Sequence, residues 1–222
     1  SGFRIRLLSQ EVTIGLLEVA DMAFPEYTHK YLNLALVMAR LSSMAMTNAR
    51  MFQQVEDAAN TDELTGLSNR RFFFRTALKE WERAERYERF LSGIMFDIDH
   101  FKQINDTYGH MTGDRVIAAL ASRCRKALRS TDVLSRYGGD EFIVLLPEID
   151  AFNAYQVAER FLKDIRGMPF DVDGHSLNIT ISLGVASLDK TCTSLDELIN
   201  RCDEALYVAK AKGRNQTFVW KP

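Results

Sequence analysis

The stretch RYGGDEF at 136–142 places two adjacent acids directly after a Gly-Gly pair. Apolar residues flank this stretch, and the glycines are therefore predicted to form the tight turn of a β-hairpin. Asp140 and Glu141 would then open the second strand, although acids are poor strand formers and seldom enter a core unpaired. Taken alone, the two acids could also be a solvated turn. The other acids of the chain must decide between these interpretations.

A third carboxylate belongs to Asp97, at the end of the apolar run 91–98. If the strands that carry Asp97, Asp140 and Glu141 are neighbours, their carboxylates converge and repel one another unless cations neutralise them. Hard oxygen ligands at strand ends suit Mg²⁺, which proteins usually share with substrate phosphates. Two such ions, about 3.5–4 Å apart, would hold the attacking and leaving oxygens of a phosphoryl transfer.

Candidate phosphate-binding groups lie elsewhere in the chain. Lys102 and the backbone N–H groups of residues 100–102 open a predicted helix, which is a ready anion site. Lys210 and Arg214 lie near the C-terminal end of another predicted helix. Their alternative role is to pair with the helix dipole next to a glycine C-cap, and both roles can hold at once.

Asn105 and Asp114 form a candidate base-recognition pair. An aspartate accepts two parallel N–H groups from the edge of guanine, and an asparagine adds a further polar contact. The two residues are separated by a predicted turn at 108–110. The spacing alone is a weak signal.

Strands and helices alternate over residues 62–222, with a hairpin in the middle. Helices are predicted at 70–89, 101–108, 113–128, 151–166 and 194–212, and strands at 90–99, along most of 170–188 and at 217–220. This order favours an α/β (α+β) sandwich of the ferredoxin-like or palm type with a mainly antiparallel sheet, because a doubly wound sheet needs a run of parallel crossovers.

The N-terminal part has a different pattern. Two strand-like runs at 4–8 and 12–19 precede a helix predicted at 27–59 without internal Gly or Pro. A heptad seam of mostly apolar residues follows this helix: Leu34, Met38, Leu41, Ala45, Asn48, Phe52, Val55 and Ala59. We interpret the helix as a dimerising or signal-carrying element. The alternative is that it packs only on its own hairpin.

The composition excludes several classes of protein. A net charge of −2 gives no electrostatic footprint for a nucleic acid polymer. Cys124, Cys192 and Cys202 are far apart and are predicted to be reduced, as in the cytoplasm. The sequence contains neither an apolar run of about 18 residues that could span a membrane nor a visible signal peptide. Because Ser1-Gly2 could be a cloning scar, membrane segments of a longer protein could lie outside this chain.

Residues 61–222 resemble a GGDEF domain, the catalytic domain of bacterial diguanylate cyclases. The resemblance rests on four motifs in order: DELTGLSNRR at 62–71, FDIDHFKQINDTYGHMTGD at 96–114, RYGGDEF at 136–142 and AKAKGRN at 209–215. It implies a nucleotidyl-cyclase palm. Residues 1–26 look like the remnant of a GAF-type sensory domain, and 27–60 would be the signalling and dimerisation helix.

The resemblance also implies the reaction. Two GTP molecules would condense to cyclic di-GMP and two pyrophosphates, each 3′-OH attacking the α-phosphate of the other nucleotide. Each domain would hold one GTP, so that a homodimer is needed for catalysis. Two Mg²⁺ ions per active site are implied, and Mn²⁺ could replace them.

Roles carry over from the family motifs by position. The implied metal ligands are Asp97, the carbonyl of Ile98, Asp140 and Glu141. The implied catalytic residues are Asp140 and Glu141, which help to deprotonate the 3′-OH in roles that the sequence does not separate, and Lys102, which stabilises developing charge. The implied substrate-binding residues are Phe101, Lys102, Asn105, His110, Asp114, Gly138, Gly139, Lys210 and Arg214.

One further family feature is the inhibitory RxxD site, which Arg129 and Asp132 match. There an arginine would bond guanine and phosphate edges of cyclic di-GMP, and an aspartate would accept guanine N–H groups. The alternative to an active, product-inhibited cyclase is a catalytically silent GGDEF domain that serves as a receptor for cyclic di-GMP or GTP. The intact motif residues favour activity.

Overall fold

The computed structural model describes residues 3–9, 12–20 and 25–221. Its internal contacts group the chain into two units, Ser1–Ala58 and Ala59–Pro222. The threefold division of the chain at 1–26, 27–60 and 61–222 stays a prediction. Within the described residues, no helix is long and apolar enough to cross a bilayer.

The first unit consists of a hairpin that packs against one face of a long helix. Strands β1 (Phe3–Ser9) and β2 (Val12–Val19) pair antiparallel, and a 3₁₀ turn at Pro25–Tyr27 leads into α1 (Thr28–Asn60). Small side chains line the buried face of α1, at Ala35, Ala39 and Ser43, and Thr47 donates a hydrogen bond to Ser9 across the contact at 3.0 Å.

The predicted seam of α1 lies outside that contact. Its large members Leu34, Met38, Leu41, Phe52 and Val55 are 52–67% exposed. The hairpin packs on the small-residue face of α1 and leaves the heptad face exposed, so the role of α1 in dimerisation or signalling stays a prediction. The likeness of this unit to the end of a GAF domain stays a prediction.

A six-stranded sheet forms the second unit, in the order β10-β9-β4-β6-β5-β3. The strands are β3 (Ser68–Asn69), β4 (Leu91–Ile98), β5 (Val133–Gly138), β6 (Glu141–Pro147), β9 (Ile181–Ser187) and β10 (Thr217–Val219). The pairs β9–β4, β4–β6 and β6–β5 are antiparallel, whereas the two edge strands are parallel to their neighbours. This mainly antiparallel sheet with helices confirms the predicted fold class.

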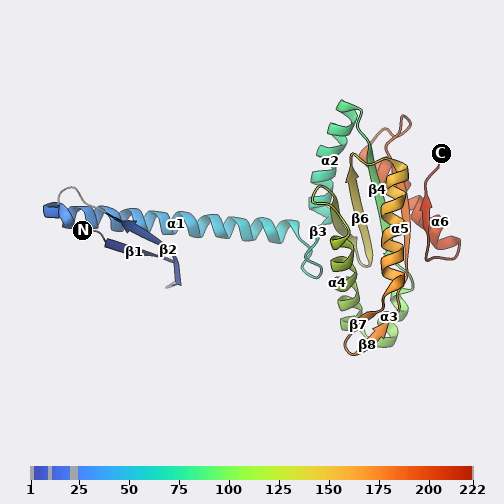
Figure 1. Cartoon of the computed structure of the whole chain (residues 1–222), viewed down its shortest axis with the longest axis horizontal. Helices are drawn as coiled ribbons and strands as arrows, with labels where there is room; N and C mark the ends of the chain where they lie inside the picture. The colour runs from blue at the N-terminus through green and yellow to red at the C-terminus, as the bar shows by residue number, and fades with distance from the viewer. Residues whose placement is uncertain (1–2, 10–11, 21–24, 222) are drawn as a thin grey trace. The chain divides into compact units, whose positions relative to one another are not determined.

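Helices cover both faces of the sheet (Figure 1). They are α2 (Arg70–Tyr87), α4 (His110–Lys126), α5 (Ala151–Gly167) and α6 (Leu195–Ala211), with the short α3 (Phe101–Tyr108) after β4. On one face, α4 and α5 pack on Phe96 and Phe142, whose rings stack 5.1 Å apart. On the other face, α2 and α6 pack on Met95 and Ile143. The alternation of side chains along each buried strand produces these two cores.

All three cysteines are free and buried. Cys124 lies in the core under α4 and α5, and Cys192 and Cys202 lie in the core under α2 and α6. Burial raises the pKa of the Cys202 thiol to about 12 and raises that of Cys124 further.

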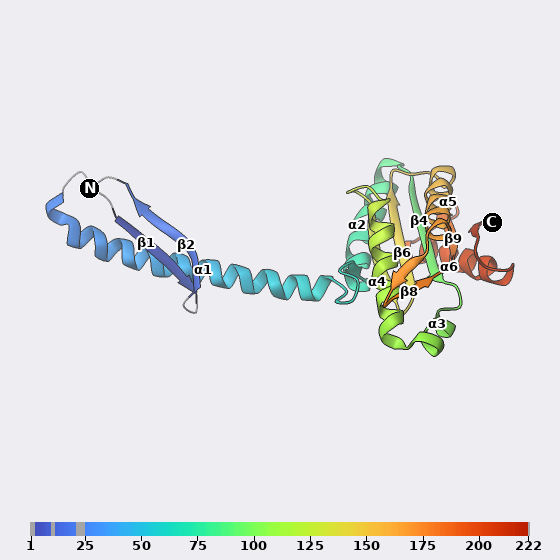
Figure 2. The same cartoon turned by 60° about the horizontal axis from the view of Figure 1, so that its bottom comes forward.

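Strands β7 (Phe170–Val172) and β8 (His175–Leu177) form a hairpin separate from the main sheet. The stretch predicted to be mostly strand at 170–188 contains three strands, with a turn at Asp173-Gly174 between the first two, and only β9 joins the main sheet. Figure 2 shows β8 near α3 and α4, at the end of the domain where β4 leads into α3.

The structure corrects two predicted boundaries. The helix predicted at 113–128 begins at His110, directly after Gly109, whose φ of 85° turns the chain sharply between α3 and α4. The central hairpin turns at Gly139-Asp140, because Gly138 still pairs with Glu141 in the strands. Gly139 supplies the positive φ, 51°, that this two-residue turn requires. Asp140 therefore lies in the turn itself and does not begin the strand.

Candidate active site

Three acidic residues lie where β4 and β6 end side by side. The antiparallel register places Asp97 directly opposite Glu141, and Asp140 precedes Glu141 in the turn. Asp97 is 7% exposed, whereas Asp140 and Glu141 are half-buried. From the sequence, these acids were expected to be close only if their two strands were neighbours. In the structure β4 and β6 are neighbours. We call this group of Asp97, Asp140 and Glu141 the acid edge.

Burial, together with the negative charges of Asp140 and Glu141, raises the pKa of Asp97 to about 6 against the opposing effect of Lys210. The Lys210 ammonium lies 2.8 Å from the Asp97 carboxylate. Across the described residues, no three His, Cys, Asp or Glu side chains are close enough together to form a ready metal site. The oxygen donors at the acid edge nevertheless have the chemistry that Mg²⁺ favours. Ile98, the last residue of β4, is 1% exposed and pairs with Ile181.

Asp99, two residues beyond Asp97, has a different environment. Its buried carboxylate accepts hydrogen bonds from the hydroxyls of Thr180 and Ser182, both at 2.7 Å, and from the backbone N–H of Asn215 at 2.9 Å. Asp99 thereby ties the end of β4 to the loop that carries Arg214. These three donors satisfy the Asp99 carboxylate, which was not among the predicted site residues.

The predicted phosphate-binding cations are only partly brought together. Lys102 is exposed in the first turn of α3, and Arg214 is exposed in a left-handed conformation with φ 63°. Lys210 is the one of the three that contacts the acid edge in the described structure. Arg166 of α5 holds the loop from outside by donating to the side chain and carbonyl of Asn215.

The candidate base-recognition residues share the corner between α3 and α4. Asn105 lies against Gly113, where an added Cβ would clash with Asn105 Oδ1. That oxygen is buried and has no hydrogen-bond partner within the described residues, which is unusual for a native structure. Asp114, one residue after Gly113, is exposed, as is His110, and Phe101 is partly buried against the core.

The two glycines at this end of the hairpin, Gly138 in β5 and Gly139 in the turn, face open space. A Cβ built on Gly138 or on Gly139 would meet nothing within 4 Å. At Gly139 the positive φ explains the residue type. Gly138 has neither a positive φ nor a close neighbour, so that the fold itself does not explain why it is a glycine.

Arg136 was not predicted to have a role, yet it holds this turn in place. Its Nε donates to the carbonyl of Gly139 at 2.8 Å, and its Nη1 lies 3.1 Å from Asp62. Asp62 also accepts from the backbone and hydroxyl of Thr65. The turn that carries Asp140 is thus joined to the segment directly after α1. Arg136 and Asp62 both belong to the family motifs quoted above, and this was the only sequence signal that could have indicated their role.

Arg129 and Asp132 lie at the opposite end of β5 from the acid edge. The Arg129 backbone N–H donates to Asp132 Oδ2 at 2.9 Å. Asp132 Oδ1 is buried and is another polar atom without a partner in the described structure. The two residues line an open pocket of about 400 Å³. They are close enough to act together.

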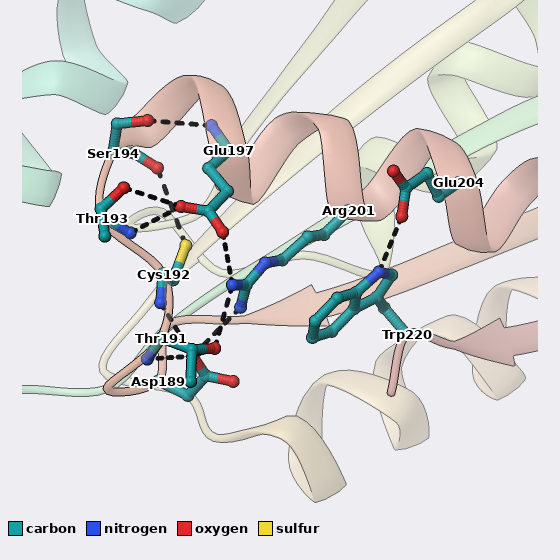
Figure 3. Close-up of polar contacts among 9 residues, drawn as sticks. All are labelled: Asp189, Thr191, Cys192, Thr193, Ser194, Glu197, Arg201, Glu204 and Trp220. Atoms are coloured by element: carbon teal, nitrogen blue, oxygen red, sulfur yellow. Dashed lines mark hydrogen bonds and ion pairs between the residues drawn. The ribbon is translucent and has the colours of Figure 1, made fainter. Parts of the chain in front are cut away.

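A second charged cluster lies around Arg201, nine residues before Lys210 on α6 (Figure 3). Arg201 is 5% exposed and lies 3.0 Å from Asp189 and 2.5 Å from Glu197. Its guanidinium carbon is 4.1 Å from the centroid of the Trp220 ring. We call these four residues the Arg201 cluster.

The carboxylates of this cluster are satisfied. Hydrogen bonds from Thr191, with support from Arg201, lower the pKa of Asp189 to about 2. Hydrogen bonds from Thr193, followed by one from Arg201, lower the pKa of Glu197. Sequence reasoning missed this cluster, because charged residues on a helix normally indicate a solvated face.

Comparison with protein families identifies one match. The model of the family described as "Diguanylate cyclase, GGDEF domain" matches residues 59–216. Diguanylate cyclase A of Treponema denticola is 34% identical over 226 residues, which cover 99% of this chain and 60% of that protein. The response regulator PleD of Caulobacter vibrioides is 40% identical over 161 residues, 72% of this chain and 36% of PleD. The chain thus spans less than two thirds of either relative.

Solved structures resemble the chain in three dimensions. The crystal structure of the coiled coil and GGDEF domain of DgcB from Caulobacter crescentus, in complex with c-di-GMP, has a TM-score of 0.78 and 30% identity, and the match covers 84% of this chain and 98% of that one. The active GGEEF domain of a diguanylate cyclase from Vibrio cholerae has a TM-score of 0.66 and 33% identity, covering 69% of this chain and 99% of that one.

Proposed function

This chain belongs to the diguanylate cyclase GGDEF family, and on that premise we propose that it condenses two GTP molecules to cyclic di-GMP and two pyrophosphates. The observation that carries the proposal is the acid edge. The β4–β6 register sets Asp97 opposite Glu141 and beside the turn of Asp140. Such a concentration of negative charge, with one carboxylate buried, is costly without cations and therefore indicates a site that binds them.

In this proposal Asp97, Asp140, Glu141 and the Ile98 carbonyl hold divalent cations. Mg²⁺, two ions per site, is the cation that we propose, and Mn²⁺ could replace it. When bound, the ions would stabilise negative charge on the reacting phosphate and favour the deprotonated 3′-oxygen. Asp140 and Glu141, the more exposed acids, are the groups placed to accept the 3′-OH proton.

Lys210 has two proposed roles, one without nucleotide and one with nucleotide bound. Without nucleotide, its ammonium partly neutralises Asp97 from 2.8 Å. With nucleotide bound, Lys210, Lys102 and Arg214 bind the phosphates. Gly138 and Gly139 leave open space beside the turn, so that a nucleotide can approach the backbone closely.

Guanine recognition is assigned to Asn105 and Asp114, with Phe101 and His110 beside them. The support is the unpartnered oxygen of Asn105, which needs a donor that the protein does not supply. The Asp114 carboxylate can accept the two N–H groups of the guanine edge. Adenine lacks that pair of donors, and GTP is therefore the proposed substrate.

Two copies of the chain must face each other, because each holds a single GTP. The exposed heptad seam of α1 supports a homodimer, since large apolar side chains at a and d positions associate in coiled coils. Met38, a flexible member of this seam, makes it adaptable. We place the helix between a GAF-like sensory part and the catalytic domain.

Arg129 and Asp132 are proposed to bind the product and to inhibit the enzyme. The support is the pocket they line and the buried, unpartnered Asp132 Oδ1, which can accept a guanine N–H. The relative DgcB was crystallised with c-di-GMP. Arg129→Ala should remove the slowing of progress curves by added cyclic di-GMP, whereas Lys126→Ala at the exposed end of α4 should retain it. If the wild type is not slowed, the inhibitory assignment fails.

Product analysis after incubation with GTP and Mg²⁺ tests the function directly. We expect cyclic di-GMP and pyrophosphate in a one-to-two ratio, with a specific activity that rises with protein concentration because dimers react. Binding of cyclic di-GMP without turnover at any concentration would instead identify the chain as a catalytically silent receptor.

A further inference from the structure

The β7–β8 hairpin lies outside the main sheet but is firmly held. Phe170, Val172 and Leu177 are 2–8% exposed and belong to the core under α4 and α5. The turn residues Asp173 and Gly174 both have positive φ, 52° and 79°, as a two-residue hairpin turn requires. The tip of the hairpin is therefore held in a defined position relative to the core of the domain.

This tip contacts the start of α4 through a carboxylate. Asp173 forms an ion pair with Arg115 and accepts a hydrogen bond from the Thr112 hydroxyl at 3.1 Å. Thr112 is 6% exposed and Asp173 retains 26% side-chain exposure. The two donors bracket Gly113 and Asp114, the residues proposed to contact Asn105 and guanine. Asp173 thus fixes the turn of α4 that carries the base-recognition carboxylate.

The hairpin also contacts the end of α3. The rings of His175 and Tyr108 are 5.1 Å apart and tilted by 51°. This contact matters because α3 has no fully buried residue, and its core contacts come from the partly buried Phe101 and Ile104. With so few core contacts, α3 depends on neighbours at its ends for its orientation.

We propose that the β7–β8 hairpin is the positioning element of the purine-recognition pocket. Asp173 and His175 hold the corner between α4 and α3, so that Asn105 and Asp114 meet the guanine edge together. The inference rests on the proposed function, which supplies the role of those two residues. Small displacements matter here, because hydrogen bonds to a base edge weaken steeply with distance and angle.

Asp173→Asn tests the inference, because it keeps the shape but removes the charge that pairs with Arg115. We expect KM for GTP to rise about tenfold, with kcat at saturation within about twofold. We also expect the preference for GTP over ITP to shrink, because ITP lacks the 2-amino group that a well-placed Asp114 would bind. Asp171→Asn, an exposed carboxylate on the same hairpin, is the matched control and should change neither value.

A purely structural role would give another result. In that case Asp173→Asn would lower the melting temperature and reduce kcat in parallel, with the GTP-to-ITP preference unchanged. That outcome, or a KM equal to that of Asp171→Asn, would overturn the proposal. His175→Ala should show the same change of preference to a smaller degree.

Direct binding separates this inference from the proposed function. 3′-Deoxy-GTP cannot cyclise, and its affinity can be compared with that of 3′-deoxy-ITP by calorimetry, whether or not the protein turns over. The wild-type protein could make no cyclic di-GMP and still bind the guanine nucleotide more tightly than the inosine nucleotide. If Asp173→Asn then lost that preference, the result would refute the proposed activity and retain the inference. No preference in the wild type would refute the inference.

Discussion

Helix α6 contributes one cation to each of two charged clusters, and the two clusters differ in how their carboxylates are satisfied. Arg201 lies between Asp189 and Glu197, and the pKa values of both acids are lowered. Lys210 lies against Asp97, yet burial keeps the pKa of that acid raised, at about 6. A cation is present in both places, but only the Arg201 cluster is electrostatically complete.

The difference comes from the number of donors that each carboxylate has. Asp189 accepts from the Thr191 hydroxyl and from backbone N–H groups as well as from Arg201. Asp97 is more deeply buried and has two acidic neighbours at the acid edge. A complete cluster stabilises the fold, whereas an incomplete one has capacity for a ligand. Four measurements can break or sharpen this contrast.

The largest effect is expected at the acid edge. Asp140→Asn removes a proposed metal ligand from the turn of the central hairpin, and kcat for cyclic di-GMP synthesis should fall at least about 100-fold. The melting temperature should stay within about 2 °C, because the half-buried Asp140 side chain forms no hydrogen bond or ion pair within the part of the chain that the structure describes. Normal turnover by this variant would show that the acid edge is not the metal site.

Asp97 makes the stability of the metal-free protein depend on pH. The acid has its usual pKa near 3.8 when unfolded and about 6 when folded. The folded protein therefore binds the proton more tightly, and stability should fall by up to about 3 kcal/mol as pH rises from 4 through 6. Denaturant titrations in EDTA should show this fall in the wild type but not in Asp97→Asn. Parallel curves for the two proteins would contradict the raised pKa.

The Arg201 cluster should show the opposite pattern, with a loss of stability and little loss of chemistry. Arg201→Met keeps the buried stem but leaves Asp189 and Glu197 without their shared cation. We expect the free energy of unfolding to fall by about 2 kcal/mol, less than for a fully buried pair because both acids reach solvent. Urea unfolding measures this loss. A fall in kcat of the folded enzyme, with stability unchanged, would assign a functional role to the cluster.

The smallest effect is expected at Trp220. Trp220→Phe keeps an aromatic face beside Arg201 but removes the hydrogen bond from Nε1 to Glu204, which measures 2.9 Å. The loss of stability should be about 0.5–1 kcal/mol, measured in the same urea titrations. A loss as large as that of Arg201→Met would mean that the ring, rather than the ion pairs, holds the cluster together.

The sequence predicted most of the catalytic fold because its signals are local. Buried strands such as 91–98 are continuous apolar runs, and helix ends are marked by caps such as Asn69, Asp150 and Ser194. The turn of the central hairpin was misplaced by one residue, because either glycine could supply a positive φ. Only the pairing of Gly138 with Glu141 distinguishes the two possibilities.

The candidate site was predictable only as a set of residue types. Sequence motifs identified Asp97 and Glu141, but their opposition depends on the pairing of two distant strands. The contact of Lys210 with Asp97 and the role of Asp173 likewise depend on tertiary packing. No periodicity or local propensity encodes such long-range contacts.

The buried cysteines provide separate reporters for the two layers of the domain. Cys124 is enclosed under α4 and α5, and Cys202 under α6, where it lies against Gly93. With thiol pKa values so far above neutral, each becomes reactive only when its own layer opens to solvent. The rate of alkylation at each cysteine therefore measures the local opening free energy of one face of the sheet. Comparing the two rates with and without nucleotide would reveal which layer opens more readily when a nucleotide binds.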